Sequence, residues 1–272
     1  MIYSVIIPTY NRCHLLAEAI DSVMQQNYPT LEIIVIDDGS TDATTEMMAD
    51  KYPGVRYFYQ TNQGPASARN RGIIEATGEL VAFLDSDDIW LDNKITIELS
   101  LLQEFPDADV LAGNASAYIE NILRTQDTFA QRNILFTHQQ PRFFDWSISI
   151  MKKGPVCCTS SMTFKKSALL QLGEKPFDEN LRFDEDWDLE FRLFNQLNVL
   201  LYPHVVCTTR AFNDGTRHFY SAPGQPKSHT EQQTIWQQQR HIISRYINNP
   251  EWDCDTKYSF QQRQQELAAL LR

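Results

Sequence analysis

The first hundred residues alternate short aliphatic runs with segments of helical spacing, and this order limits the folds available to the chain. The predicted strands cover residues 3–7, 32–36, 55–59 and 80–84. The continuous aliphatic run at 32–36 is typical of a strand that is covered on both faces. A repeated strand–helix order predicts an α/β fold with a doubly wound, mostly parallel sheet and helices on both faces.

The predicted helices follow from apolar residues that recur every three or four positions. They cover residues 15–24, a polar stretch ending near Asp50, 65–76 and 93–105, and a fifth strand is expected at 110–112.

Beyond residue 115 the pattern is weaker, and residues 120–142 resemble a long, partly ordered connection. The apolar stretch at 143–151 is ambiguous. The later elements expected are a strand at 159–164, helices at 166–172 and 186–195, one or two strands within 199–208, and helices at 230–246 and 256–271.

The composition excludes several classes of protein. The net charge is -11 and no Lys/Arg run is present, so nucleic acid and an anionic membrane surface are not expected as partners. The first residues lack a basic segment and are interrupted by Pro8, and no apolar run approaches about 20 residues, so neither a signal peptide nor a membrane span is predicted. Five cysteines without a C-x-x-C pair indicate free thiols and a cytoplasmic protein.

Polar residues follow three of the predicted strands, at 9–12, 37–42 and 85–88. Ligands of open α/β sheets bind beyond the carboxyl ends of the strands, so these three clusters predict one nucleotide-type site. No G-x-G-x-x-G segment and no Walker lysine loop is present, which disfavours dinucleotide and P-loop sites.

The carboxylates Asp85, Asp87 and Asp88 lie together where the fourth strand ends. Such a cluster repels itself unless a cation is present, and its oxygens suit Mg²⁺ or Mn²⁺ beside a diphosphate. The alternative is that these acids solvate a turn and cap the helix that begins near Asn93.

Two further segments have both a functional and a structural interpretation. Asp37 and Asp38 could accept hydrogen bonds from a base or ribose, while Asp42 is expected to cap the helix that follows. Gly64 precedes a helix that carries Arg69 near its start, a combination suited to binding phosphate, although Arg69 could equally be a surface charge.

A second acidic cluster, residues 184–188, begins the helix striped with Trp187 and Phe191. Acids at a helix start are stabilised by the helix dipole, but one carboxylate here could be a general base for a hydroxyl. Asp188 and Arg192, four residues apart, are expected to pair. His218 could assist a metal or diphosphate, although a lone histidine is more often structural.

These segments together resemble the inverting glycosyltransferases of family 2, which have the GT-A fold. The matching segments are 4–12, 36–42, 64–72, 83–88, and 177–179 with 185–188, and the resemblance covers about residues 1–215. It implies a nucleotide-sugar-binding half at 1–115, an acceptor-binding and catalytic half at 116–215, and a C-terminal helical extension at 216–272.

The resemblance also implies residue roles. Asp186 would be the catalytic base, and Asp87 or Asp88 would hold Mn²⁺ or Mg²⁺. The residues implied to bind the nucleotide sugar are Pro8, Thr9, Tyr10, Asn11, Arg12, Asp37, Asp38, Gly64, Arg69, Asp85 and Ser86.

The implied reaction is transfer of one sugar, with inversion, from a UDP-sugar to a hydroxyl of a glycan or lipid-linked acceptor in cell-surface polysaccharide or glycoconjugate synthesis. A lipid-linked acceptor would bring the protein transiently to the inner membrane face, and the C-terminal helices could mediate oligomers. The Gln-x-x-Arg-Trp motif of processive synthases is absent. One departure concerns the stretch 209–214, where Phe212 stands near a histidine of relatives and His218 could substitute.

Two other functions stay open at this point. A sugar nucleotidyltransferase also uses a doubly wound sheet and an acid-bound metal, but the segment after the first strand lacks its glycine-rich loop. A non-catalytic glycan-binding or scaffold protein on the same fold is the other alternative.

Overall fold

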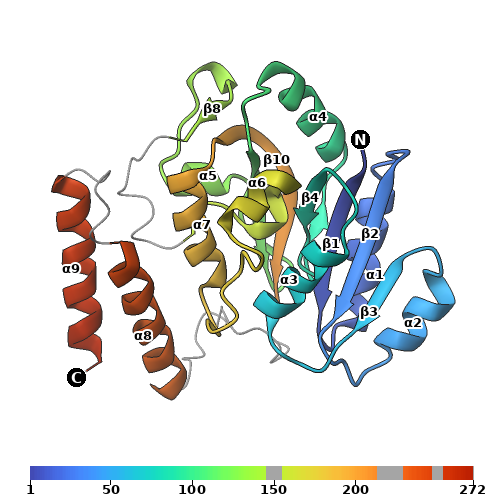
Figure 1. Ribbon diagram of the computed structural model, residues 1–272, viewed down its shortest axis with the longest axis horizontal. Helices are drawn as coiled ribbons and strands as arrows, with labels where there is room; N and C mark the ends of the chain where they lie inside the picture. Colours follow the sequence, from blue (N-terminus) through green and yellow to red (C-terminus); the bar gives the residue numbers. More distant parts are fainter. Residues whose placement is uncertain (145–154, 213–228, 247–253, 272) are drawn as a thin grey trace.

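The computed structural model describes residues 1–144, 155–212, 229–246 and 254–271. These residues form one mixed sheet with helices on both faces (Figure 1). The strands are β1 (Tyr3–Thr9), β2 (Leu31–Asp37), β3 (Arg56–Tyr59), β4 (Leu80–Phe83), β5 (Ile89–Trp90), β6 (Val110–Ile119), β7 (Ile122–Thr125), β8 (Arg142–Phe143), β9 (Met162–Lys165) and β10 (Val199–Ala211). The α-helices are α1 (Cys13–Met24), α2 (Thr44–Lys51), α3 (Pro65–Glu75), α4 (Lys94–Glu104), α5 (Thr128–Gln131), α6 (Lys166–Leu169), α7 (Glu185–Gln196), α8 (His229–Tyr246) and α9 (Cys254–Leu270).

The strand order is β3-β2-β1-β4-β9-β6-β10-β5, with β7 paired to β6 and β8 to β10. The strands β3, β2, β1 and β4 are parallel, and so are β6 and β10. The strand β9 joins these two groups in antiparallel orientation. The predicted α/β fold with a mostly parallel sheet is therefore confirmed.

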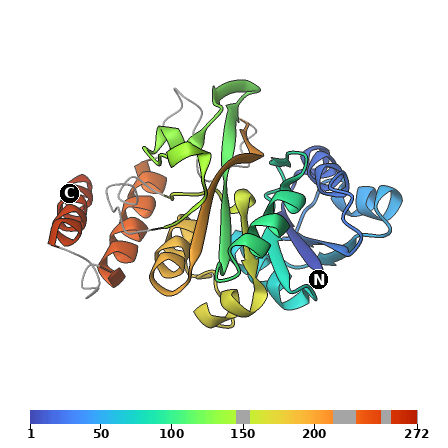
Figure 2. The ribbon, with the colours of Figure 1, turned by 90° about the horizontal axis from the view of Figure 1, so that it is seen from above.

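Alternate residues of each strand point to opposite faces of the sheet. Both faces are buried, so neighbouring residues of one strand contribute to different core clusters. Ile6 of β1 contributes to one core cluster, which includes residues of α3, α6 and α7. Its neighbours Val5 and Ile7 contribute to a second cluster on the other face, with residues of α1, α2 and α4. Figure 2 shows the sheet nearly edge-on between these two layers of helices.

The second half of the chain differs from its prediction in three places. The strand β6 has 10 residues, where only 110–112 were expected, because Gly113 to Ser116 carry little apolar signal. The stretch expected as a strand from residue 159 begins instead with a 3-10 helix, Thr159–Ser161. The expected connection at 120–142 contains β7, α5 and the 3-10 helix Thr137–Gln139, and the ambiguous segment 143–151 lies mostly outside the described residues.

The C-terminal helices α8 and α9 lie beside α7 (Figure 1). Tyr246 of α8 stacks on Phe191 of α7 with ring centroids 4.8 Å apart, and Phe260 of α9 packs on the same ring at 5.5 Å. Arg245 forms ion pairs with Asp178 and Asp188, at 2.7 and 3.0 Å. In the part of the chain that the structure describes, none of the helices is long and apolar enough to cross a membrane.

Candidate functional site

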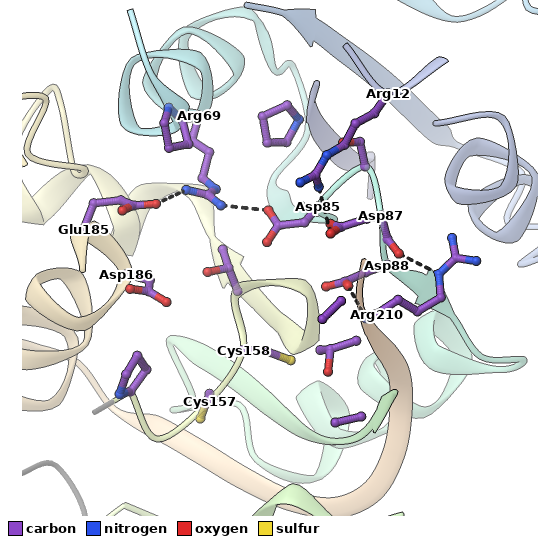
Figure 3. A pocket seen from close by; sticks show the side chains of 18 of the residues that line it. Arg12, Arg69, Asp85, Asp87, Asp88, Cys157, Cys158, Glu185, Asp186 and Arg210 are labelled. Carbon is purple, nitrogen blue, oxygen red and sulfur yellow. Dashed lines mark hydrogen bonds and ion pairs between the residues drawn. The ribbon is translucent and has the colours of Figure 1, made fainter. Parts of the chain in front are cut away.

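A cavity of about 510 Å³ opens beyond the carboxyl ends of β1, β2 and β4 (Figure 3). Its wall includes Thr9 at the end of β1, Asp38 after β2 and Asp85 after β4. The predicted convergence of three polar clusters on one rim is what the structure shows. The far wall comes from the second half of the chain and includes Asp186 of α7 and Arg210 of β10.

Most of the residues expected at the nucleotide-sugar, metal and catalytic positions line this cavity. They are Pro8, Thr9, Tyr10, Arg12, Asp38, Gly64, Arg69, Asp85, Ser86, Asp87, Asp88 and Asp186.

Asn11 and Asp37 are not part of the cavity wall. Asp37 is fully buried, and its carboxylate accepts hydrogen bonds from Ser40 N at 2.7 Å and from the Tyr57 hydroxyl at 2.5 Å. The Asn11 side chain accepts a hydrogen bond from Thr41 N at 2.7 Å. The structure thus places both side chains inside the turns that support the wall, and their contact with a nucleotide sugar stays a prediction.

Asp38 organises the loop between β3 and α3. Its Oδ1 accepts from Gln60 Nε2 at 2.8 Å and from Gln63 N at 2.9 Å, while Oδ2 accepts from Gly64 N at 2.8 Å. Burial raises the pKa of this carboxyl, and the three hydrogen bonds oppose that rise. Gly64 needs its φ of 92° at this bend, a conformation that residues with a Cβ rarely adopt.

The Asp85–Asp88 turn is held by residues from the second half of the chain. Asp88 accepts hydrogen bonds from the Ser160 hydroxyl at 2.6 Å and from Arg210 N at 2.9 Å. Asp85 N donates to the Ser160 hydroxyl at 3.1 Å. The Asp88 carboxylate accepts these bonds and does not cap α4, so the capping interpretation fails for this residue.

Each of two cavity arginines forms a short ion pair with a carboxylate of this turn. Arg12 contacts Asp87 at 2.7 Å. Arg69 contacts Asp85 at 2.7 Å through one guanidinium nitrogen and Glu185 at 2.7 Å through another. Arg69 is only 5% exposed, which excludes the surface-charge alternative. It links the Asp85–Asp88 turn to the first turn of α7, as Figure 3 shows.

Asp186 faces the cavity from the first turn of α7 (Figure 3). Burial raises the pKa of this carboxyl well above its ordinary value of 3.8, and repulsion by Glu185 and Asp184 raises it further. A carboxylate with a raised pKa is a stronger base, which suits proton abstraction from a hydroxyl. The predicted pair of Asp188 and Arg192 is confirmed at 3.0 Å.

The acidic turn supplies the ligand chemistry for a divalent cation. Asp85 and Asp87 both line the cavity, and carboxylate oxygens are the ligands that Mg²⁺ and Mn²⁺ prefer. Among the residues described, no three His, Cys, Asp or Glu side chains group as a complete metal site. The turn therefore fits an ion that takes its other ligands from a diphosphate and water, as Mg²⁺ commonly does.

Several residues in and behind the cavity wall were not predicted. Ser160, behind the wall, and Arg210, in it, support the acidic turn, and Glu185 pairs with Arg69. Only Glu185 had a local signal, because it lies in the acidic cluster beside Asp186. Cys158 lines the wall with its sulfur 3.4 Å from that of Cys207, both as free thiols. His218 lies outside the described residues.

The family comparison agrees with this geometry. A family model described as Glycosyl transferase family 2 matches residues 4–173, more than half of the chain. The chain belongs to glycosyl transferase family 2. Its sugar-transfer chemistry is thereby supported at the level of the family.

Curated relatives are named as glycosyltransferases. An uncharacterized glycosyltransferase of Rickettsia typhi is 30% identical over 219 residues, which are 78% of this chain and 64% of the relative. Glycosyltransferase GlyG of Streptococcus pneumoniae is 42% identical over 124 residues, 43% of this chain and 40% of the relative. A relative from Rickettsia felis is 50% identical over 103 residues, 37% of this chain and 17% of its own length. The chain thus spans less than two thirds of the length of these relatives.

Solved structures share the fold. The crystal structure of S. aureus TarS 1-349 in complex with UDP-GlcNAc superposes with a TM-score of 0.71 at 21% identity, covering 99% of this chain and 72% of that one. The mannosyltransferase PcManGT of Pyrobaculum calidifontis, in complex with GDP-Man and Mn²⁺, gives a TM-score of 0.64 at 20% identity, covering 98% and 73%. The GT-A fold is thus confirmed for this chain.

Proposed function

We propose that this protein transfers a single sugar from a nucleoside diphosphate sugar, a UDP-sugar in the first instance, to an acceptor hydroxyl with inversion. The observation that carries the proposal is the shared cavity, in which Asp186 faces a wall made by Arg12, Arg69 and the Asp85–Asp88 turn. The UDP and UDP-GlcNAc complexes of TarS support a uridine donor.

The donor occupies the half of the cavity beyond β1, β2 and β4 in this proposal. Thr9 and Asp38 lie on the nucleoside side, and the Thr9 hydroxyl is buried without a hydrogen-bond partner among the described residues. A buried, unpaired hydroxyl is costly, and a bound base or ribose would satisfy it. A diphosphate bound beside the Asp85–Asp88 turn would meet the guanidinium groups of Arg12 and Arg69.

The reaction is one displacement. The Asp186 carboxylate takes the proton of the acceptor hydroxyl, whose oxygen forms a bond to the anomeric carbon of the donor. The bond from that carbon to the diphosphate oxygen breaks on the opposite face, and the nucleoside diphosphate leaves with its electron pair. One displacement inverts the anomeric configuration, and the protein supplies no nucleophile.

A divalent cation would be held by Asp87 together with Asp85 or Asp88. When bound, Mn²⁺ or Mg²⁺ supplies positive charge to the diphosphate leaving group. Arg12 would stay beside that group, because its guanidinium already contacts Asp87.

The test is a panel of nucleotide sugars. Purified protein with Mn²⁺ is incubated with each donor and a mixture of glycan acceptors, and the released nucleoside diphosphate is measured. We expect release from one donor, and loss of release with EDTA. Calorimetry with UDP, dTDP and GDP in the presence of Mn²⁺ accompanies the panel; failure of all three to bind would contradict the proposal and favour the scaffold alternative. Cytoplasmic location, a lipid-linked acceptor and a role in cell-surface polysaccharide synthesis stay predictions.

A further inference from the structure

The arginines of the cavity fall into two groups that differ in their partners. Six arginines line it, in a protein whose net charge is -11. Arg12, Arg69 and Arg210, around the donor half, each form an ion pair of 2.5–2.7 Å with a carboxylate. Their charge is largely balanced within the wall.

The other three, Arg124, Arg132 and Arg182, come from the second half of the chain. Arg124 lies on β7, Arg132 directly follows α5, and Arg182 precedes α7 by three residues. No carboxylate among the described residues lies within ion-pair distance of these three guanidinium groups, unlike those of Arg12, Arg69 and Arg210. Arg182 instead lies over the Phe183 ring, 5.8 Å from its centroid.

These arginines line the same cavity as the candidate base. Arg182 is four residues before Asp186 in the chain. Arg132 is close enough to the buried Glu190, one turn further along α7, to lower the pKa of that carboxyl against the larger effect of burial. Tyr118 and Thr128 line the same wall and offer an aromatic face and a hydroxyl.

Guanidinium groups that line a cavity and have no ion-pair partner among the described residues attract anions. Arginine binds phosphate and carboxylate through paired N–H donors. A neutral sugar acceptor would leave these charges without a function. We infer that the acceptor carries an anionic group, a phosphate or a carboxylate, which this arginine wall (Arg124, Arg132 and Arg182) binds while the acceptor hydroxyl faces Asp186. The inference rests on the proposed function and adds the chemical class of its acceptor.

The experiment measures probe binding to the protein already loaded with UDP and Mn²⁺, so that the donor half is occupied. Glucose 6-phosphate and glucuronate are the anionic probes, and glucose is their neutral counterpart. We expect at least one anionic probe to bind about tenfold more tightly than glucose, the scale of one charge-assisted hydrogen bond. The two anionic arms distinguish a phosphate-bearing from a carboxylate-bearing acceptor.

The variants R132Q and R124Q/R182Q remove the charges while keeping polar side chains. We expect both to bind the preferred anionic probe as weakly as glucose, with UDP affinity unchanged. Because Arg124 and Arg182 are exposed, the double variant should fold, and a matched variant, K51Q/K175Q, removes two exposed charges elsewhere. That control should bind the probe like the wild type.

Three outcomes would overturn the inference. Equal binding of glucose and both anionic probes would show that the wall does not select anions. Unchanged probe binding in the arginine variants, or an equal loss in K51Q/K175Q, would show that these side chains are only surface charge. Failure of the wild type to bind UDP would instead remove the proposed function itself, so the two failures are distinguishable.

Discussion

At the scale of single residues, Asp186 is the side chain on which the proposed chemistry depends. Asp186→Asn keeps the shape of the side chain and its hydrogen bond to Trp187 N, 2.8 Å in the wild type, but removes the base. We expect sugar transfer to fall by about 10²–10⁴-fold, the usual contribution of a general base, with UDP affinity unchanged. Initial rates and calorimetry measure the two quantities. Asp50→Asn, on an exposed part of α2, is the control, and parallel losses of rate and UDP affinity would mean that Asp186 is structural.

Glu190 gives the protein a pH-dependent stability. Burial raises the pKa of this carboxyl from 4.5 to about 8, although its oxygens accept hydrogen bonds from Val156 N and Cys157 N at 2.5 and 2.7 Å. Because the folded protein holds this proton more tightly than the unfolded chain, the stabilisation is complete below pH 4.5 and is lost as the pH rises through about 8. We expect the free energy of unfolding to fall less across this range in Glu190→Gln than in the wild type, as measured by denaturant titration.

The comparison needs a matched carboxylate. Glu46→Gln removes an exposed acid of α2 and should reproduce the wild-type pH dependence. If Glu190→Gln shows the same pH dependence of stability as the wild type, the pKa of Glu190 is not raised in the folded protein.

At the scale of elements, α3 packs closely on β1 at Gly72. A Cβ added at Gly72 would overlap Cγ2 of the fully buried Ile6. We therefore expect Gly72→Ala to lower the free energy of unfolding by about 1–3 kcal/mol, a typical effect of overpacking. Gly54→Ala is the control, because an added Cβ there meets nothing within 4 Å. Chemical denaturation measures both, and equal stability of the two variants would show that α3 can shift without cost.

The elements of the first half were predictable because their signals are local. The strands β1, β2 and β4 are aliphatic runs, and the helices between them carry regular apolar spacing. The strand β5 has only two residues, Ile89 and Trp90, and exists because β10 pairs with it. In β10 the register shifts around Pro203, whose ring cannot donate a ladder hydrogen bond, so no simple alternation marks this strand.

The residues of the site differ in the same way: some have a local sequence signal, and others are positioned by distant parts of the chain. Thr9, Asp38, Asp85 and Arg69 could be expected in the cavity because each follows a strand or begins a helix that the sequence marks. The support that Ser160 and Arg210 give to the acidic turn could not be expected, because their positions depend on pairings with residues far away in the chain. Asn11 and Asp37 lie outside the cavity wall for a different reason: in a turn of consecutive polar residues, sequence alone does not reveal which side chains bind the turn's own amides.

At the scale of the whole molecule, α8 and α9 share the apolar core of the rest of the protein. Phe260 is fully buried against Phe191 of α7, in the cluster that extends to Ile6 of β1. We expect Phe260→Ala to lower the free energy of unfolding by about 3–5 kcal/mol, as for other buried aromatic residues, within a single transition. Tyr258→Ala, at a side chain 60% exposed, should have little effect.

Two probes decide whether the transition is single. Circular dichroism at a helix wavelength and tryptophan fluorescence should give coincident unfolding curves for the wild type and for Phe260→Ala. Curves that separate in the variant would mean that α8 and α9 unfold independently of the sheet.

The pairing of β10 with β5 also has a consequence for the order in which the protein matures during synthesis. The Asp85–Asp88 turn is encoded early, but Arg210 N, from the end of β10, supplies one of the hydrogen bonds that hold Asp88. A ribosome must therefore release more than 200 residues before the first half of the chain can take its final shape. Until then the nascent chain carries an acidic turn without its support, so we expect the cavity to form late, only after β10 has been synthesised.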